Sequence, residues 1–229
     1  MTLPVSNEDK SNEVKDEQSS NNCAILSIVV VLKFFNSNFS NMFYNCESLE
    51  ILDLKQLKTS SAENMAEMFY GCKSLKSLSK YFDVKSVTDM TSMFYGCTSL
   101  TELDLSEFET NSLKKADYLF YGCSSLESIN LNKFNTSELT TMEFMFYKCY
   151  NITKLDLSSF STEKVTSTQF MFNSCTSLSE LNLSNFNLKN CNTFTSMFTG
   201  VKDLKVIIND NEDNKVFLDK FRDKLTITK

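Results

Sequence analysis

The sequence VTDMTSMFYGCTSLTELDLSEFET, residues 87–110, decides the fold because variants of it occur seven times along the chain. Successive copies lie 26 residues apart, except for one interval of 25 residues. Self-similarity at a fixed period of this length is typical of stacked repeat proteins. The segment MFYGC or a variant of it ends at Cys46, Cys72, Cys97, Cys123, Cys149, Cys175 and Val201.

Each copy contains a short predicted strand. In the third copy, Leu103 and Leu105 alternate with polar residues, which is the period-two pattern of a strand with one buried face. We expect the polar residues between these leucines to face the solvent. The positions predicted to be buried are Leu103, Leu105, Ile129, Leu131, Leu155, Leu157, Leu181 and Leu183.

The segment before each Cys position is predicted to be a short helix. Val87, Met90, Met93, Phe94 and Cys97 lie at intervals of three and four residues, which suits one apolar stripe of a helix. The four glycines all directly precede a Cys or Val of this position, so the backbone there is expected to be left-handed or tight.

One 26-residue unit buries too few apolar side chains to offset its conformational entropy, so the units must stack on one another. We therefore predict an α/β fold: a solenoid with short parallel strands on one face and short helices on the other. The repeats are predicted to span residues 23–210, beginning with a degenerate cap at 23–45. A disordered acidic and polar tail, 1–22, is expected before them and a capping helix, 211–229, after them.

The composition excludes several kinds of chemistry. The chain has no His, so neither a Ser-His-Asp site nor a Cys/His zinc site can form, and its four glycines form no phosphate-binding loop. The net charge of −6 argues against nucleic acid. No run of 18 apolar residues suggests a membrane span, and residues 24–32 make a poor signal peptide. We expect no enzymatic activity, cofactor, metal or small-molecule substrate.

The eight cysteines are predicted to be reduced and buried. Six occupy one repeat position, which Val201 fills in the seventh copy, so this position favours a small apolar side chain. The parallel Cα–Cβ bonds of neighbouring repeats disfavour disulfides along such a row.

The outward positions of the strands form the candidate protein-binding surface. In a stack they would make one continuous face, on which acidic and amide side chains alternate. A merely solvated face remains an alternative, and calcium binding by the Asp side chains a more remote one. The tyrosines of the MFYGC segments are expected to pack with exposed hydroxyl groups. The candidate residues are Glu102, Asp104, Ser128, Asn130, Lys154, Asp156, Glu180 and Asn182.

The unit MFYGCTSLTELDLSEFET, preceded by VTDMTS, resembles the BspA-like leucine-rich repeats, and above all their mycoplasma-type surface-protein variant. The resemblance covers about residues 36–209. It implies a leucine-rich-repeat fold and a cell-surface or extracellular adhesion protein that binds a host or matrix protein. The alternative is a cytoplasmic scaffold or regulator that recruits another protein.

Overall fold

The structure is a computed structural model. The predicted tail, residues 1–22, and residues 23–36 of the predicted cap lie outside the part of the chain that it describes. The described residues are 37–52, 59–78, 83–223 and 225–228.

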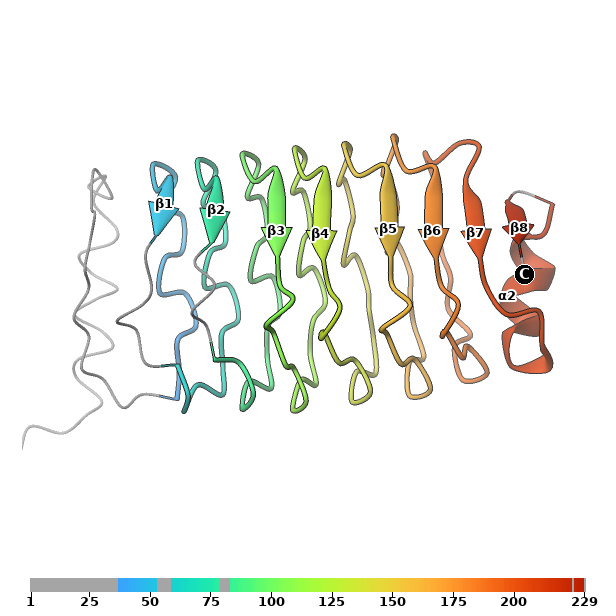
Figure 1. Ribbon diagram of the computed structural model, residues 1–229, viewed down its shortest axis with the longest axis horizontal. Coiled ribbons are helices and arrows are strands. Elements are labelled where there is room, and N and C mark those ends of the chain that lie inside the picture. The colour runs from blue at the N-terminus through green and yellow to red at the C-terminus, as the bar shows by residue number, and fades with distance from the viewer. Residues whose placement is uncertain (1–36, 53–58, 79–82, 224, 229) are drawn as a thin grey trace, which may run out of the picture.

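The chain forms an α/β repeat fold in which successive repeats lie side by side along one axis, each contributing one short strand to the same face (Figure 1). Every strand pair among the described residues is parallel, and the longest sheet has the order β5-β6-β7-β8. The strands are β1 (Ile51–Leu52), β2 (Ser77–Leu78), β3 (Glu102–Asp104), β4 (Ser128–Asn130), β5 (Lys154–Asp156), β6 (Glu180–Asn182), β7 (Lys205–Ile207) and β8 (Thr226–Thr228).

The register of the strands places equivalent residues of adjacent repeats opposite each other. Leu103 pairs with Ile129, and Leu155 pairs with Leu181. Of the eight positions predicted to be buried, seven are buried and Ile129 is half-buried. The period-two pattern therefore identified the inward face of the strands correctly.

The predicted helices before each Cys position are not present in the described repeats, and this part of the fold prediction was wrong. The segment instead forms consecutive turns. In the third repeat, the N–H groups of Met93 and Cys97 close turns by donating to the carbonyls of Met90 and Phe94. A helix would satisfy its interior N–H groups within itself. Here the N–H of Phe94 donates instead to the carbonyl of Leu119 in the next repeat.

Left-handed residues recur every four positions within these turns. In the third repeat they are Ser92, at φ 55°, and Gly96, at φ 68°. Helical residues need a negative φ, so this backbone cannot continue as a helix. The turns place one apolar side chain inward at every third or fourth residue, which is the spacing that resembles a helix in the sequence. Lys148 and Ser174 adopt the left-handed conformation at the position that Gly96 holds.

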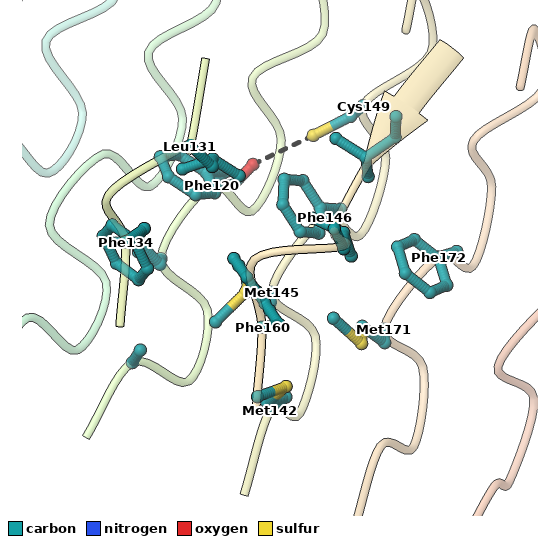
Figure 2. Close-up of a cluster of buried hydrophobic side chains, with 14 of the residues drawn as sticks. Phe120, Leu131, Phe134, Met142, Met145, Phe146, Cys149, Phe160, Met171 and Phe172 are labelled. Atoms are coloured by element: carbon teal, nitrogen blue, oxygen red, sulfur yellow. Dashed lines mark hydrogen bonds between the residues drawn. The ribbon is translucent and has the colours of Figure 1, made fainter. Parts of the chain in front are cut away.

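The core consists of columns of identical side chains from successive repeats. Phe120, Phe146 and Phe172 are fully buried and stack with ring centroids 5.2 and 5.8 Å apart. Figure 2 shows these rings in a row, with Met145 and Met171 packed beside them. Burying each such side chain contributes roughly 1.5–3 kcal/mol, and the contribution depends on the adjacent repeat.

The C-terminal end of the stack is closed by η1 (Glu212–Asn214), α2 (Lys215–Phe221) and β8. The helix lies within the predicted capping region but ends earlier than expected, and β8 adds a further strand beside β7. Phe217 and Phe221 of α2 meet Phe194 and Phe198 edge-on, at interplanar angles of 70° to 87°. The parallel column of rings therefore ends at this helix.

Candidate binding surfaces

The strand face carries the candidate residues that the sequence singled out. Their side chains form two rows across β3 to β6, because the parallel register aligns Glu102 with Ser128 and Asp104 with Asn130. The outer row, Glu102, Ser128, Lys154 and Glu180, is exposed. In the second row Asp104 and Asp156 are exposed, whereas Asn130 and Asn182 are half-buried.

The second row of the strand face has a structural role. The Oδ1 atoms of Asp104 and Asp156 accept hydrogen bonds from the N–H groups two residues later, at 3.1 and 2.9 Å. Asn130 and Asn182 make the same contact. Asp and Asn cap turns in this way wherever a strand ends. This capping accounts for both residue types at this position without any ligand.

The outer row of the strand face is partly paired within itself. Lys154 Nζ lies 3.0 Å from Glu180 Oε2, across adjacent repeats. Such an exposed pair contributes little to stability. The strand face therefore offers an extended surface of mixed charge.

The opposite side of the stack, which we call the turn face, carries two columns of aromatic side chains. The first contains the predicted tyrosine positions; Tyr95, Tyr121 and Tyr147 are half-buried and stack with ring centroids 4.3 and 4.6 Å apart. The second column consists of Tyr118, Phe144 and Phe170, which we call the aromatic trio. The sequence reasoning missed the trio, although one repeat position holds an aromatic residue in three successive copies.

The rings of the trio stack on one another outside the buried core. Tyr118 lies 4.7 Å from Phe144, and Phe144 lies 4.6 Å from Phe170, measured between ring centroids. All three side chains are half-buried. The Phe144 ring also lies 5.6 Å from the Tyr147 ring, so the two columns form one surface.

Acidic side chains border the aromatic trio. Asp117 accepts hydrogen bonds from the Thr141 hydroxyl and the Glu143 N–H, both at 2.8 Å. Burial raises the pKa of Asp117, and this effect is larger than the lowering by the two hydrogen bonds. The negative charges of Glu143 and Asp89 raise the pKa further. The pKa of Tyr118 is also raised, mainly by burial and to a smaller extent by the negative charges of Glu143 and Asp117. The acids are therefore close enough to act on the aromatic surface.

The cysteines of the described repeats are buried, free thiols. Five of them donate a hydrogen bond to a Phe carbonyl in the preceding repeat, namely Cys72, Cys97, Cys123, Cys149 and Cys175. Cys123 Sγ lies 3.1 Å from Phe94 O and Cys149 Sγ lies 3.1 Å from Phe120 O. Burial raises the pKa of Cys123 and of Cys175 to about 12, so neither thiol is a nucleophile near neutral pH. Within the described part of the chain, no group of three or more Cys, Asp or Glu is arranged to hold a metal ion.

A family model described as "Mycoplasma protein of unknown function, DUF285" matches residues 37–131 and 117–211. These two matches together span most of the chain and all of the central repeats. The chain belongs to the DUF285 family. This membership confirms the resemblance to the mycoplasma-type BspA-like repeats.

Among solved structures, this DUF285 chain is similar to a leucine-rich cell surface protein from Faecalibacterium prausnitzii A2-165. The two share 16% sequence identity with a TM-score of 0.37, over 75% of this chain. This chain covers 65% of the length of that structure. No curated protein matches this chain. No helix within the described residues is long and apolar enough to cross a membrane.

Proposed function

We propose that this chain is a non-enzymatic repeat scaffold that binds a protein partner. The observation that supports this proposal is the register of the repeats, which aligns exposed side chains in rows on the strand face and stacks rings in columns on the turn face. Rows of this kind provide the extended surfaces through which repeat proteins bind their partners. The buried, protonated thiols and the satisfied polar side chains are structural groups, and they leave the exposed rows as the functional surface.

We further propose that the scaffold acts at the cell surface as an adhesion module, as its resemblance to the BspA-like repeats implies. Labelling of intact cells with a membrane-impermeant biotin reagent tests this location. The exposed ammonium groups of Lys73, Lys133 and Lys164 can be reached by the reagent. Labelling of intact cells is the expected result, whereas labelling only after lysis would favour the intracellular scaffold.

The strand face can be tested as the binding surface with a variant that neutralises its acids. Glu102→Gln and Glu180→Gln remove charge, while Asp104→Asn and Asp156→Asn keep an oxygen that can cap each turn. We expect the free energy of unfolding to change by less than about 0.5 kcal/mol per exposed substitution. Cells displaying the variant should attach more weakly to host or matrix protein than cells displaying the unaltered chain. Unchanged attachment would exclude the strand face and leave the turn face as the contact surface.

A further inference from the structure

We infer that the turn face carries a docking site for a cationic protein segment, centred on Tyr118, Phe144 and Phe170. This inference rests on the proposed function, because it names the chemistry of a partner for a protein-binding scaffold. It concerns a surface different from the strand face that the sequence singled out.

The backbone of the aromatic trio is unusual. Tyr118, Phe144 and Phe170 have φ values of 61°, 56° and 56°. Bulky residues rarely adopt this left-handed region, and such outliers concentrate at functional sites. The same repeat position holds the small residues Ser92 and Ser196 at φ 55° and 51° in neighbouring repeats. The turn thus forms readily without an aromatic residue, so the fold itself does not require the trio.

Core packing does not account for the trio either. Each of these repeats already contributes a fully buried Phe to the central column, such as Phe146 beside Phe144. The trio lies on the outside of that column and remains half-buried. Three successive repeats therefore place a further aromatic ring outside the buried column, where it can be reached from solvent.

The charges around the trio select a cationic partner. Asp117 and Glu143 directly precede the first two rings in the sequence, and the Glu143 N–H donates to the Asp117 carboxylate. The Asp117 carboxylate also accepts from the Thr141 hydroxyl, and the Glu143 carboxylate accepts from the Gln169 amide. Neither carboxylate has a Lys or Arg partner among the described residues. A guanidinium or ammonium group can pair with such carboxylates while its flat or apolar part packs on the rings.

The chain itself shows that a ring of this surface accepts a cation. Tyr147 is the last ring of the tyrosine column, because the next repeat has Asn173 at that position. Lys148 Nζ lies over the Tyr147 ring, 5.3 Å from its centroid. Phe170 ends the trio in the same way, since Ser196 follows it in the column. The described part of the chain provides no cation contact to the half-buried Phe170 ring, and we infer that a cation of the partner packs against it.

The test uses the full chain and substitutions borrowed from its own neighbouring repeats. The aromatic variant Tyr118→Ser/Phe144→Ser/Phe170→Ser reproduces the residue found at Ser92 and Ser196. The acid variant Glu143→Gln reproduces Gln169. The variant Glu127→Gln serves as the matched control, because it removes the same charge from an exposed residue outside the rows of the strand face and the columns of the turn face. Thermal unfolding monitored by circular dichroism checks that each variant is folded.

The probe is a short fluorescent peptide of alternating Arg and Ser, titrated by fluorescence anisotropy. We expect it to bind the unaltered chain, and its affinity to fall about tenfold in the aromatic variant, about 1.4 kcal/mol. The acid variant should also bind more weakly, the control should not, and added salt should weaken binding. A peptide of alternating Glu and Ser should not bind.

Three results would overturn the inference. They are no binding of the Arg peptide, equal binding by the unaltered chain and the folded aromatic variant, or binding of a neutral oligosaccharide that requires the trio. If the aromatic variant does not fold, the comparison of Glu143→Gln with Glu127→Gln decides. An equal loss in both variants would show attraction to net charge alone. If the Arg peptide does not bind but cell attachment still depends on the strand face, this inference fails and the proposed function stands.

Discussion

At the scale of single residues, the sign of φ decides which residue type is favoured at the position directly before the Cys of each repeat. Gly96 has φ 68°, and a Cβ added there would meet no atom closer than 3.9 Å. The backbone conformation alone therefore favours glycine at this position, and lack of space does not. Lys148 adopts φ 60° at the equivalent place and carries the strain that glycine avoids.

Lys148→Gly should stabilise the protein by about 0.5–1 kcal/mol. Relief of a left-handed backbone contributes roughly 1–2 kcal/mol, and the greater chain entropy of glycine offsets part of it. Urea unfolding measures the change. The opposite substitution, Gly96→Ala, should destabilise the protein by about 1 kcal/mol. A stabilised Gly96→Ala variant would contradict this account of the position.

The buried thiols predict a loss of stability at alkaline pH. Cys123 has a pKa of about 12 in the folded chain, and the ordinary thiol pKa is 9.0. Because folding favours the protonated form, the thiol's contribution is fully present below about pH 9 and is lost as the pH rises toward 12. Comparing urea unfolding at about pH 7 and about pH 10 should show the decrease, and Cys123→Val should reduce it.

Near neutral pH the same Cys123→Val substitution should cost about 0–1.5 kcal/mol, because valine fills nearly the same volume. It removes the thiol's hydrogen bond to Phe94 O. Iodoacetamide should label the thiols of the described repeats only in denaturant, as read by intact mass. Detection of a disulfide between any two of Cys46, Cys72, Cys97, Cys123, Cys149 and Cys175 would contradict this prediction.

At the scale of elements, each repeat is tied to the next through buried hydrogen bonds as well as apolar columns. The fully buried hydroxyls of Thr136 and Thr162 donate to the carbonyls of Ser161 and Asn187 in the next repeat, at 2.8 and 2.9 Å. At the C-terminal end Asn214 takes over this role, and it too is fully buried.

Asn214→Ala should destabilise the C-terminal cap by about 2–4 kcal/mol. The side chain donates to Phe186 O and Asn209 O and accepts from the Leu188 N–H, each at 3.0 Å. Its removal leaves buried polar groups without partners, which is costly. Hydrogen exchange across α2 and urea unfolding measure the effect. Val216→Ala on the same helix is the control, because Val216 is 57% exposed and should change stability little.

At the scale of the whole molecule, exposed ion pairs favour the observed register of the repeats. Lys73 pairs with Glu47 and Lys164 with Glu138, both at 2.7 Å and both 26 residues apart in sequence. Each pair contributes little energy by itself. A shift of the register would separate these opposite charges along the stack, so together they favour one alignment.

Removal of one whole repeat should leave a folded protein, because each repeat contacts only its neighbours. Deleting residues 124–149 joins equivalent positions of adjacent repeats. We expect a cooperative unfolding transition whose urea m-value is lower by about one-seventh, since m scales with the surface exposed on unfolding. Deleting only residues 124–136 breaks the register and should abolish the transition. Equal behaviour of the two deletions would contradict the stacking principle.

The sequence by itself determined the repeat period, the strand positions and the inward leucines, because each of these follows from the spacing of apolar and polar residues along the chain. Its apolar intervals of three and four also fit a helix. Only the tertiary structure decided that this segment forms turns, since Phe94 donates its N–H to Leu119 of another repeat. The outward rows of the strand face could likewise be listed from the sequence. That Asp104 caps a turn, while Phe144 stacks between two other half-buried rings, depends on contacts between residues, and one-dimensional spacing does not encode these contacts.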